Sequence, residues 1–243
     1  MSRDPGLDTS VSPTLAQILE RPDIWRGKVL ANAPVPGVPT GFADLDRELP
    51  GGGWPRGNLI ELLPKHCGIG ELSLLLPVLV WLSSVELAWL VCVAPPQPLY
   101  APALNQCGID LSRLLMISGP GRDAAWACER ALAVDGVGGV VAWLPTLQDS
   151  SLRRLQLAAE ASHTLLFVFR PAACASQSSP APLRLILEGD GEQLMVRLLK
   201  RRGGAQTTPL SIAVHRPVPL THALACSVSA APASRGFVQS AIA

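Results

Sequence analysis

Charged side chains are scarce in this chain of 243 residues, where Asp, Glu, Lys and Arg make up 16% and hydrophobic residues 48%. A soluble domain usually carries roughly 25% charged residues. So large an apolar share excludes intrinsic disorder for most of the chain, because burying it offsets the entropy lost on ordering. The length suits one domain of ordinary size, alone or with appendages.

A long uninterrupted apolar run is also missing. The most apolar stretch, residues 72–94, contains Pro77 and Glu86, whereas a membrane-spanning helix needs about 20 consecutive apolar residues. The stretch is better explained as a buried helix followed by a buried strand. Because residues 1–5 also lack the apolar core of a secretory signal, we expect a cytoplasmic protein without membrane contact.

Neither cysteine nor histidine occurs in a metal-binding pattern. The six cysteines form no C-x-x-C pair, and the four histidines do not cluster. Zinc sites and disulfide frameworks need such spacing, so we expect reduced thiols, no metal and no cofactor. The cysteines are Cys67, Cys92, Cys107, Cys128, Cys174 and Cys226.

Charge is unevenly distributed, although the formal net charge is only +1. Residues 1–150 carry 10 basic and 15 acidic side chains, a net −5, and residues 151–243 carry 10 basic and 4 acidic ones, a net +6. A basic C-terminal half is typical of proteins that meet nucleic acid or an acidic partner.

Two short basic runs are the candidates for DNA or partner contact. Arg153 and Arg154 are expected near the start of a helix, and Lys200, Arg201 and Arg202 at the end of a strand. Either run could bind DNA phosphates. The first could equally be a solvated helix face, and the second a charged strand end that guards against edge pairing. The sequence leaves both alternatives open.

Apolar strands alternate with helical patterns through the middle of the chain, and a hairpin follows. This order predicts an α/β fold: a mainly parallel sheet with helices on both faces and a C-terminal antiparallel hairpin. The expected strands are 58–63, 87–93, 114–117, 137–143, 164–169, 183–188, 193–200 and 211–214, and the expected helices 71–83, 100–106, 122–134 and 149–161.

Three parts are predicted along the chain. Residues 1–35 form a lead with a short helix at 15–20, which begins with the capping pair Thr14 and Gln17. Residues 36–215 form the core, and residues 216–243, rich in Ala, Ser and Pro, form a flexible tail.

Tryptophan supplies most of the few aromatic side chains, which make up 5% of the chain. Those in apolar contexts are expected in the core, and those near loops are candidate anchors for a protein partner. The first group is Trp81, Trp89, Trp126 and Trp143, and the second is Trp25 and Trp54.

The loop after the first strand stands where a P-loop enzyme binds phosphate. Such a loop needs glycine-rich backbone, a lysine for the phosphates and a Ser or Thr for magnesium. Here Ile69 replaces the lysine and Gly70 the hydroxyl residue, Glu71 would repel a phosphate, and Pro64 lacks an N–H. We therefore predict a degenerate nucleotide loop. Its residues are Leu63, Pro64, Lys65, Gly68, Ile69, Gly70 and Glu71.

The carboxylates of such an enzyme are missing as well. A nucleotide hydrolase of this class places an Asp at the end of a buried strand to hold magnesium, but the strand 137–143 ends without one. The strand 87–93 is likewise followed by a proline-rich loop rather than by a catalytic Glu. We expect a protein that is not an enzyme.

Several segments resemble the RecA recombinase core, in order, across residues 36–215. They are 40–46, 51–62, 100–115, 151–169 and 193–203. The string Gly-Gly-Gly-Trp-Pro-Arg-Gly at 51–57, together with the loop 63–71, resembles the ImuA family, which is sometimes labelled SulA-like. The resemblance implies a RecA-like, P-loop-type core.

The resemblance also implies a role and partners. It suggests a non-catalytic accessory factor of SOS-induced, error-prone translesion DNA synthesis. Its partners would be an ImuB-like, inactive Y-family polymerase homologue and an error-prone replicative-type polymerase, with RecA and DNA as further candidates. Tyr100 falls where RecA stacks the adenine base, which makes it a candidate for nucleotide stacking; the alternative is a half-buried aromatic that packs its helix.

Two other functions stay open. One is a DNA-dependent ATPase or recombinase with an unconventional nucleotide site, perhaps built on Lys65. The other is a SulA-like inhibitor of cell division that binds a tubulin-like filament protein.

Overall fold

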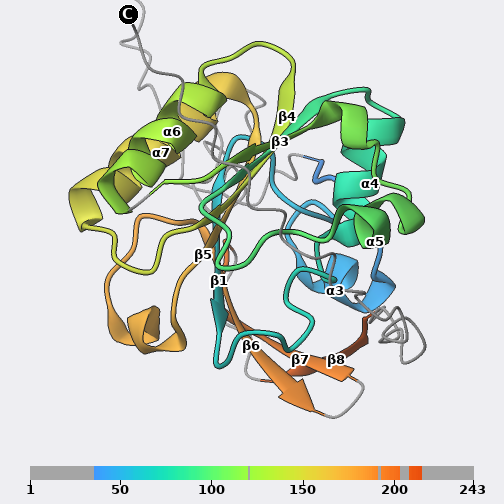
Figure 1. The fold of residues 1–243 in the computed structure, drawn as a ribbon. Coiled ribbons are helices and arrows are strands. Elements are labelled where there is room, and N and C mark those ends of the chain that lie inside the picture. Colours follow the sequence, from blue (N-terminus) through green and yellow to red (C-terminus); the bar gives the residue numbers. More distant parts are fainter. Residues whose placement is uncertain (1–35, 120, 191–192, 203–207, 215–243) are drawn as a thin grey trace, which may run out of the picture.

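One eight-stranded sheet, in the order β3-β2-β4-β5-β1-β6-β7-β8, runs through the computed structural model (Figure 1). The structure describes residues 36–119, 121–190, 193–202 and 208–214. The predicted helix at 15–20, Trp25 and the predicted tail at 216–243 lie outside these described residues. The strands are β1 Leu59–Pro64, β2 Trp89–Val93, β3 Leu114–Ile117, β4 Val137–Trp143, β5 Leu165–Phe169, β6 Leu183–Asp190, β7 Gln193–Lys200 and β8 Leu210–Ala213.

The first six strands are mutually parallel, whereas β7 and β8 add antiparallel pairs beyond β6. Strands in the middle of the sheet are short apolar runs because both of their faces are covered. All five residues of β5, for example, are buried.

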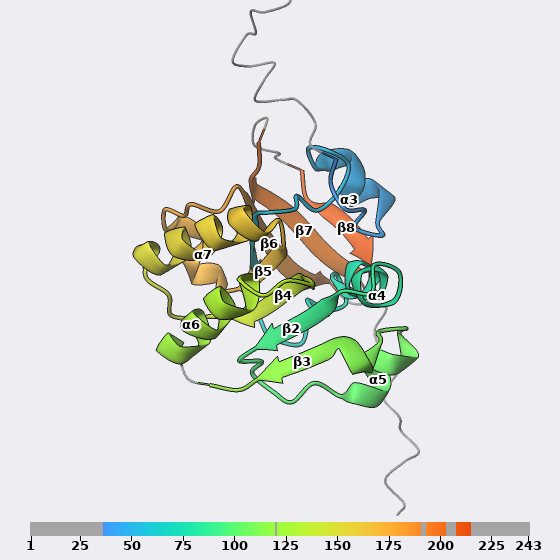
Figure 2. The ribbon, with the colours of Figure 1, turned by 90° about the horizontal axis from the view of Figure 1, so that it is seen from above.

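Helices cover the two faces unequally, as Figure 2 shows from above. α6 and α7 lie side by side on one face, and α4 lies on the other, with α3 and α5 on the same side of the molecule. The helices are α3 Ala43–Glu48, α4 Leu76–Ser84, α5 Ala101–Gln106, α6 Gly121–Leu132 and α7 Asp149–Ser162, with the 3-10 turns η1 Leu111–Arg113 and η2 Ala172–Ser176.

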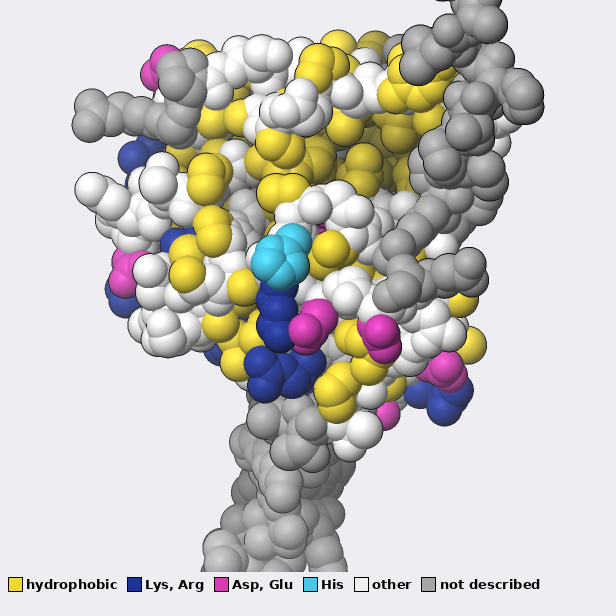
Figure 3. Space-filling model, turned by 60° about the horizontal axis from the view of Figure 1, so that its bottom comes forward, with side chains coloured by type: hydrophobic (Ala, Val, Ile, Leu, Met, Phe, Trp, Pro, Cys, Tyr) yellow, Lys and Arg dark blue, Asp and Glu magenta, His cyan; other side chains and the backbone are white. Residues whose placement is uncertain are grey.

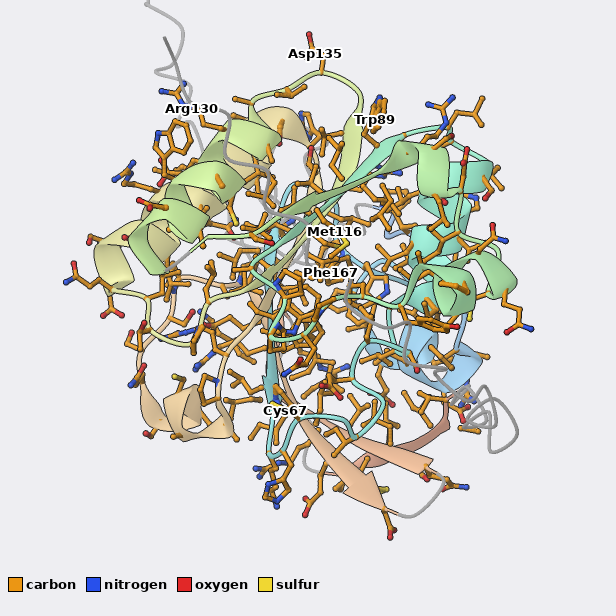
Figure 4. The ribbon with its side chains drawn as sticks, viewed as in Figure 1. Cys67, Trp89, Met116, Arg130, Asp135 and Phe167 are labelled. Atoms are coloured by element: carbon orange, nitrogen blue, oxygen red, sulfur yellow. The ribbon has the colours of Figure 1, made fainter. Side chains whose placement is uncertain are left out.

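Two apolar layers follow from the alternation of side chains along the strands. In β2, Leu90 and Cys92 join the layer that contains α4, whereas Val91 and Val93 join the layer beneath α6 and α7. Phe167 of β5 lies in the first layer, in the middle of the molecule (Figure 4).

The loop after β1 is longer than predicted, so its glycines are separated from the helix that follows. Residues 65–75 form turns and bends, and α4 begins at Leu76 rather than near Glu71. Pro77 explains the late start, because proline is tolerated in the first turn of a helix but not further in. The loop glycines therefore do not lie at a helix N-terminus, where a P-loop needs them.

The predicted fold class, a RecA-like P-loop-type core, is therefore wrong. Between β1 and α4 the chain lacks the short strand-to-helix turn that would make this loop a phosphate cradle. The family comparison reported below points the same way. Among the described residues, no helix is both long and apolar enough to cross a membrane.

The predicted places of three tryptophans are also wrong. Trp54, a candidate partner anchor, is fully buried and packs edge-on against Phe167, with 5.3 Å between ring centroids. Trp126, expected in the core, is 57% exposed, and Trp89 is 38% exposed. The most exposed tryptophan among the described residues is thus on α6.

Candidate functional site: the loop after β1 and its surroundings

Lys65, the first residue after β1, is held against β6 by two contacts. Its backbone N–H donates to the carbonyl of Leu187 (2.9 Å), and its Nζ lies 2.7 Å from Oε2 of Glu188. Both side chains of this ion pair are about half exposed. The ammonium that an unconventional nucleotide site would need is therefore already paired with a carboxylate.

The middle of the loop is closed by its own acidic residue. The backbone N–H of Gly68 donates to a carboxylate oxygen of Glu71 (3.0 Å). Gly68 and Gly70 have φ of +80° and +90°, a left-handed conformation that glycine adopts without strain. An amide that a phosphate would use thus binds an acidic side chain of the protein.

Ile69 contacts the β6–β7 hairpin instead of reaching toward solvent. A Cβ built on Gly189 would lie 3.0 Å from Cγ2 of Ile69, so the two residues are in close contact. Ile69 is partly buried against the apolar layer that contains α4. Leu63 and Pro64 end β1, and Leu63 is fully buried. The loop residues thus make apolar contacts with the core and ion pairs or hydrogen bonds within the chain. That this is a degenerate nucleotide loop stays a prediction.

Beside this loop, the interior holds a group that the sequence analysis does not single out. Glu61, in the middle of β1, is fully buried and binds two arginines. Its Oε1 accepts from Nη1 of Arg170 (2.7 Å), and its Oε2 accepts from Nε of Arg184 (2.5 Å). Both arginines are at least 95% buried. The one available signal was a lone charge inside the apolar strand at 59–64, since a buried charge needs a partner.

The two arginines also fix the segment that follows β5. Arg184 donates to the carbonyls of Cys174, Ala175 and Gln177. Arg170 donates to the side chain of Gln177 (3.1 Å), while its buried Nε has no partner among the described residues. One carboxylate thus forms ion pairs with two guanidinium groups. Through Arg170 and Arg184, the cluster also positions η2 and the residues after it.

Tyr100 is separate from these groups. It is the residue before α5, and its backbone carbonyl accepts from the N–H groups of Ala103 and Leu104. The residue is 62% exposed, and its side chain makes no hydrogen bond or ring contact with another described residue. It is therefore not half-buried packing for its helix, and its role in nucleotide stacking stays a prediction.

The basic residues lie on different elements, and most are paired within the chain. Arg154 on α7 pairs with Glu129 on α6 (2.5 Å), and its neighbour Arg153 is exposed. At the end of β7, Lys200 donates to the carbonyl of Ser179 (2.9 Å).

Arg201 donates to the carbonyl and carboxylate of Glu48 at the end of α3, and Arg202 is exposed. On the face drawn in Figure 3, Lys and Arg side chains stand beside Asp and Glu side chains rather than forming a continuous basic surface. Whether either run contacts DNA or a partner stays a prediction. Within the described ranges, no cluster of three potential metal ligands occurs.

Comparison with known proteins gives one consistent result. The family model described as "Cell division inhibitor SulA" matches residues 64–165. A cell division inhibitor SulA of Photorhabdus laumondii is 34% identical over 112 residues, which cover 46% of this chain and 63% of that protein. One of Serratia proteamaculans is 30% identical over 120 residues, which cover 49% of this chain and 71% of that protein.

A solved structure of SulA from Pseudomonas aeruginosa is 28% identical, with a TM-score of 0.40, and the match covers 46% of this chain and 97% of that one. The chain thus spans less than two thirds of the Photorhabdus protein that it matches.

These comparisons overturn the predicted ImuA membership. The family model and the relatives are SulA proteins, which supports the SulA-like alternative that the sequence left open. The predicted role in translesion synthesis is therefore wrong. The predicted ImuB-like and error-prone polymerase partners are wrong as well, because they followed from the ImuA resemblance alone. Two segments carried the ImuA resemblance: the string at 51–57 lies outside the matched residues, and the loop 63–71 lies almost wholly inside them.

Proposed function

Because the chain belongs to the SulA family, we propose that it is an inhibitor of cell division. The observation that carries the proposal is the similarity to the Serratia proteamaculans inhibitor, 30% identical over 71% of that protein's length. The matched segment, residues 64–165, contains α4 to α7 and β2 to β4. We place the inhibitory surface within this segment.

We further propose that the protein inhibits by binding rather than by catalysis. The contacts of the loop after β1 support this, because Lys65 is paired with Glu188 and the amide of Gly68 with Glu71. Nucleotide phosphates would have to displace both carboxylates and would meet no free lysine at the loop. The partner would be a tubulin-like protein of the division machinery that assembles into filaments.

The outer strand β3 supplies a surface suited to that partner. β3 pairs with β2 on one side only, and Leu115 and Met116 are 49% and 44% exposed (Figure 4 labels Met116). As neighbours in a strand, they point to opposite faces of the sheet. An edge with unpaired backbone groups, apolar side chains on both faces and no charge is a ready site for protein binding.

Expression of the chain in a rod-shaped bacterium tests the proposal. Cells should elongate without dividing while their mass continues to increase, and they should recover once expression stops. The purified protein should reduce filament assembly by the tubulin-like division protein, measured by light scattering, and should not hydrolyse ATP. Normal cell length at confirmed high levels of folded protein would overturn the inhibitory function. ATP turnover that is lost in Lys65→Ala would overturn the non-catalytic mechanism.

A further inference from the structure

The outer surface of α6 and α7 carries two large apolar side chains that the core does not use. Trp126 on α6 is 57% exposed, and Leu157 on α7 is 64% exposed. A groove of about 520 Å³ lies between the two helices, which run side by side over one face of the sheet (Figure 1). Its lining residues are Trp126, Glu129, Arg130, Arg154, Leu157 and Ala158.

Helical phase explains why these two side chains face outward. The buried residues of α6 recur at the spacing of one helix face, three or four positions apart. They are Ala124, Ala125, Ala127, Cys128, Ala131 and Leu132. Trp126 lies two positions after the first of them and so points away from the sheet. On α7, Leu157 stands in the same way opposite the buried Leu152, Leu155 and Ala159.

The exposed charged side chains around this apolar surface are arginines. The guanidinium of Arg130 lies over the ring of Trp126, 5.5 Å from its centroid. Arg154 binds Glu129, whose side chain is only 19% exposed, whereas that of Arg154 is 65% exposed. The one carboxylate of the lining is thus recessed and paired, and both guanidinium groups reach solvent.

We propose that this groove binds an amphipathic helix of a partner protein, one that places a large apolar side chain beside acidic residues. The apolar side chain would pack between Trp126 and Leu157, and the carboxylates would bind Arg130 and Arg154 with charge-assisted hydrogen bonds. A helix suits the site because a third helix can pack along the furrow between two neighbouring ones. Tryptophan and arginine are also the residues that most often dominate binding energy.

The groove is of a size to bind a short segment of a partner rather than a second copy of this chain. Six residues line it, whereas a stable interface between whole proteins uses roughly 20–30 residues on each side. The groove shares no residue with the exposed edge of β3, so it is a second binding surface, beyond the proposed inhibition of division.

Two synthetic amphipathic helices test the proposal on the full chain. Both carry leucines along one face; one flanks them with glutamates and the other with lysines. Fluorescence polarisation should show binding of the acidic peptide and little binding of the basic one. Trp126→Ala should weaken the acidic peptide about tenfold or more, the size expected for loss of a central anchor. Val85→Ala removes an equally exposed side chain elsewhere (65% exposed) and should leave binding unchanged.

A charge-reversed variant provides the decisive comparison. Arg130→Glu combined with Arg154→Glu should reverse the preference, so that the basic peptide binds better than the acidic one. Circular dichroism should show the wild-type fold, because both side chains are exposed. Equal binding of both peptides, or unchanged binding by Trp126→Ala, would overturn the proposal. So would a wild-type dimer in size-exclusion chromatography that Trp126→Ala converts to monomer, because the occupant would then be a second copy.

Discussion

Glu61 is the residue on which the interior charge balance depends. It is the single carboxylate between the guanidinium groups of Arg170 and Arg184, and all three side chains are buried. A buried ion cluster of this kind contributes little net stability compared with an apolar core, because desolvation opposes the attraction. Its contribution is geometric: it fixes β5, β6 and η2 relative to β1.

Glu61→Gln should therefore destabilise the fold strongly, because it leaves two buried positive charges side by side. The free energy of unfolding should fall by about 3–5 kcal/mol, the usual effect of removing one partner from a buried pair. Urea denaturation measures this change. Glu188→Gln is the matched control, since its pair with Lys65 is about half exposed and should contribute under about 1 kcal/mol. Equal effects of the two substitutions would contradict the role of the cluster.

Burial sets the reactivity of two cysteines. Desolvation raises the pKa of Cys92 and of Cys128 to about 12, from an ordinary value of 9.0, and nearby Glu129 adds to the rise at Cys128. Only the thiolate is nucleophilic. In the folded protein at pH 10, iodoacetamide should modify the exposed Cys67 and leave these two cysteines intact, as peptide mass spectrometry can show.

The same shift predicts how stability depends on pH. Between about pH 9 and pH 12 the two thiols lose protons in the unfolded chain but keep them in the folded one, so the unfolded state is favoured as pH rises. Their contribution to stability is complete below about pH 9 and is lost above it. A urea midpoint that does not fall between pH 9 and pH 10.5, or rapid alkylation of Cys92 in the folded protein, would contradict this assignment.

At the scale of elements, strand positions are predictable because each strand is an apolar run bounded by turn residues. β3, β4 and β7 have the predicted bounds. The start of α4 is not predictable from apolarity alone, since three of the five residues at 71–75 are leucines, and the position of Pro77 decides it. Trp126 was misplaced for a related reason: its neighbours are apolar, but helical phase, not composition, determines which residues face the sheet.

The edge of β3 gives a prediction at this scale. Leu115→Lys should abolish most of the cell elongation that the wild-type chain causes, because a charge on an edge strand opposes strand pairing and apolar contact. The side chain is 49% exposed, so the fold should persist, which circular dichroism checks. Val85→Lys, at a residue that is 65% exposed and lies outside both β3 and the groove between α6 and α7, should leave elongation unchanged. If both variants elongate cells as the wild type does, the inhibitory surface lies elsewhere in residues 64–165.

At the scale of the whole molecule, the sequence carried the α/β alternation, but it favoured ImuA over the SulA-like alternative that the comparisons support. The RecA-like segments and the glycine-rich string favoured ImuA, because short motifs of turn and strand residues are shared by unrelated functions. The candidate site was located only in part. The unusual loop after β1 is visible as missing lysine and hydroxyl residues, whereas the cluster of Glu61, Arg170 and Arg184 joins residues more than 100 positions apart, and no local pattern encodes it.

The family match ends at residue 165, yet the fold depends on strands beyond it. β1 lies between β5 and β6, and β6 and β7 contribute six fully or nearly fully buried apolar residues to the layer that contains α4. A chain that ends after residue 182 would expose the edge of β1 and take Arg184 from Glu61. We expect this truncated chain to aggregate and to show no cooperative thermal transition, measured by circular dichroism and size-exclusion chromatography, and to leave cell length normal. Cooperative melting near the temperature of the full chain would instead make the matched segment a self-sufficient unit, with the C-terminal strands an addition to it.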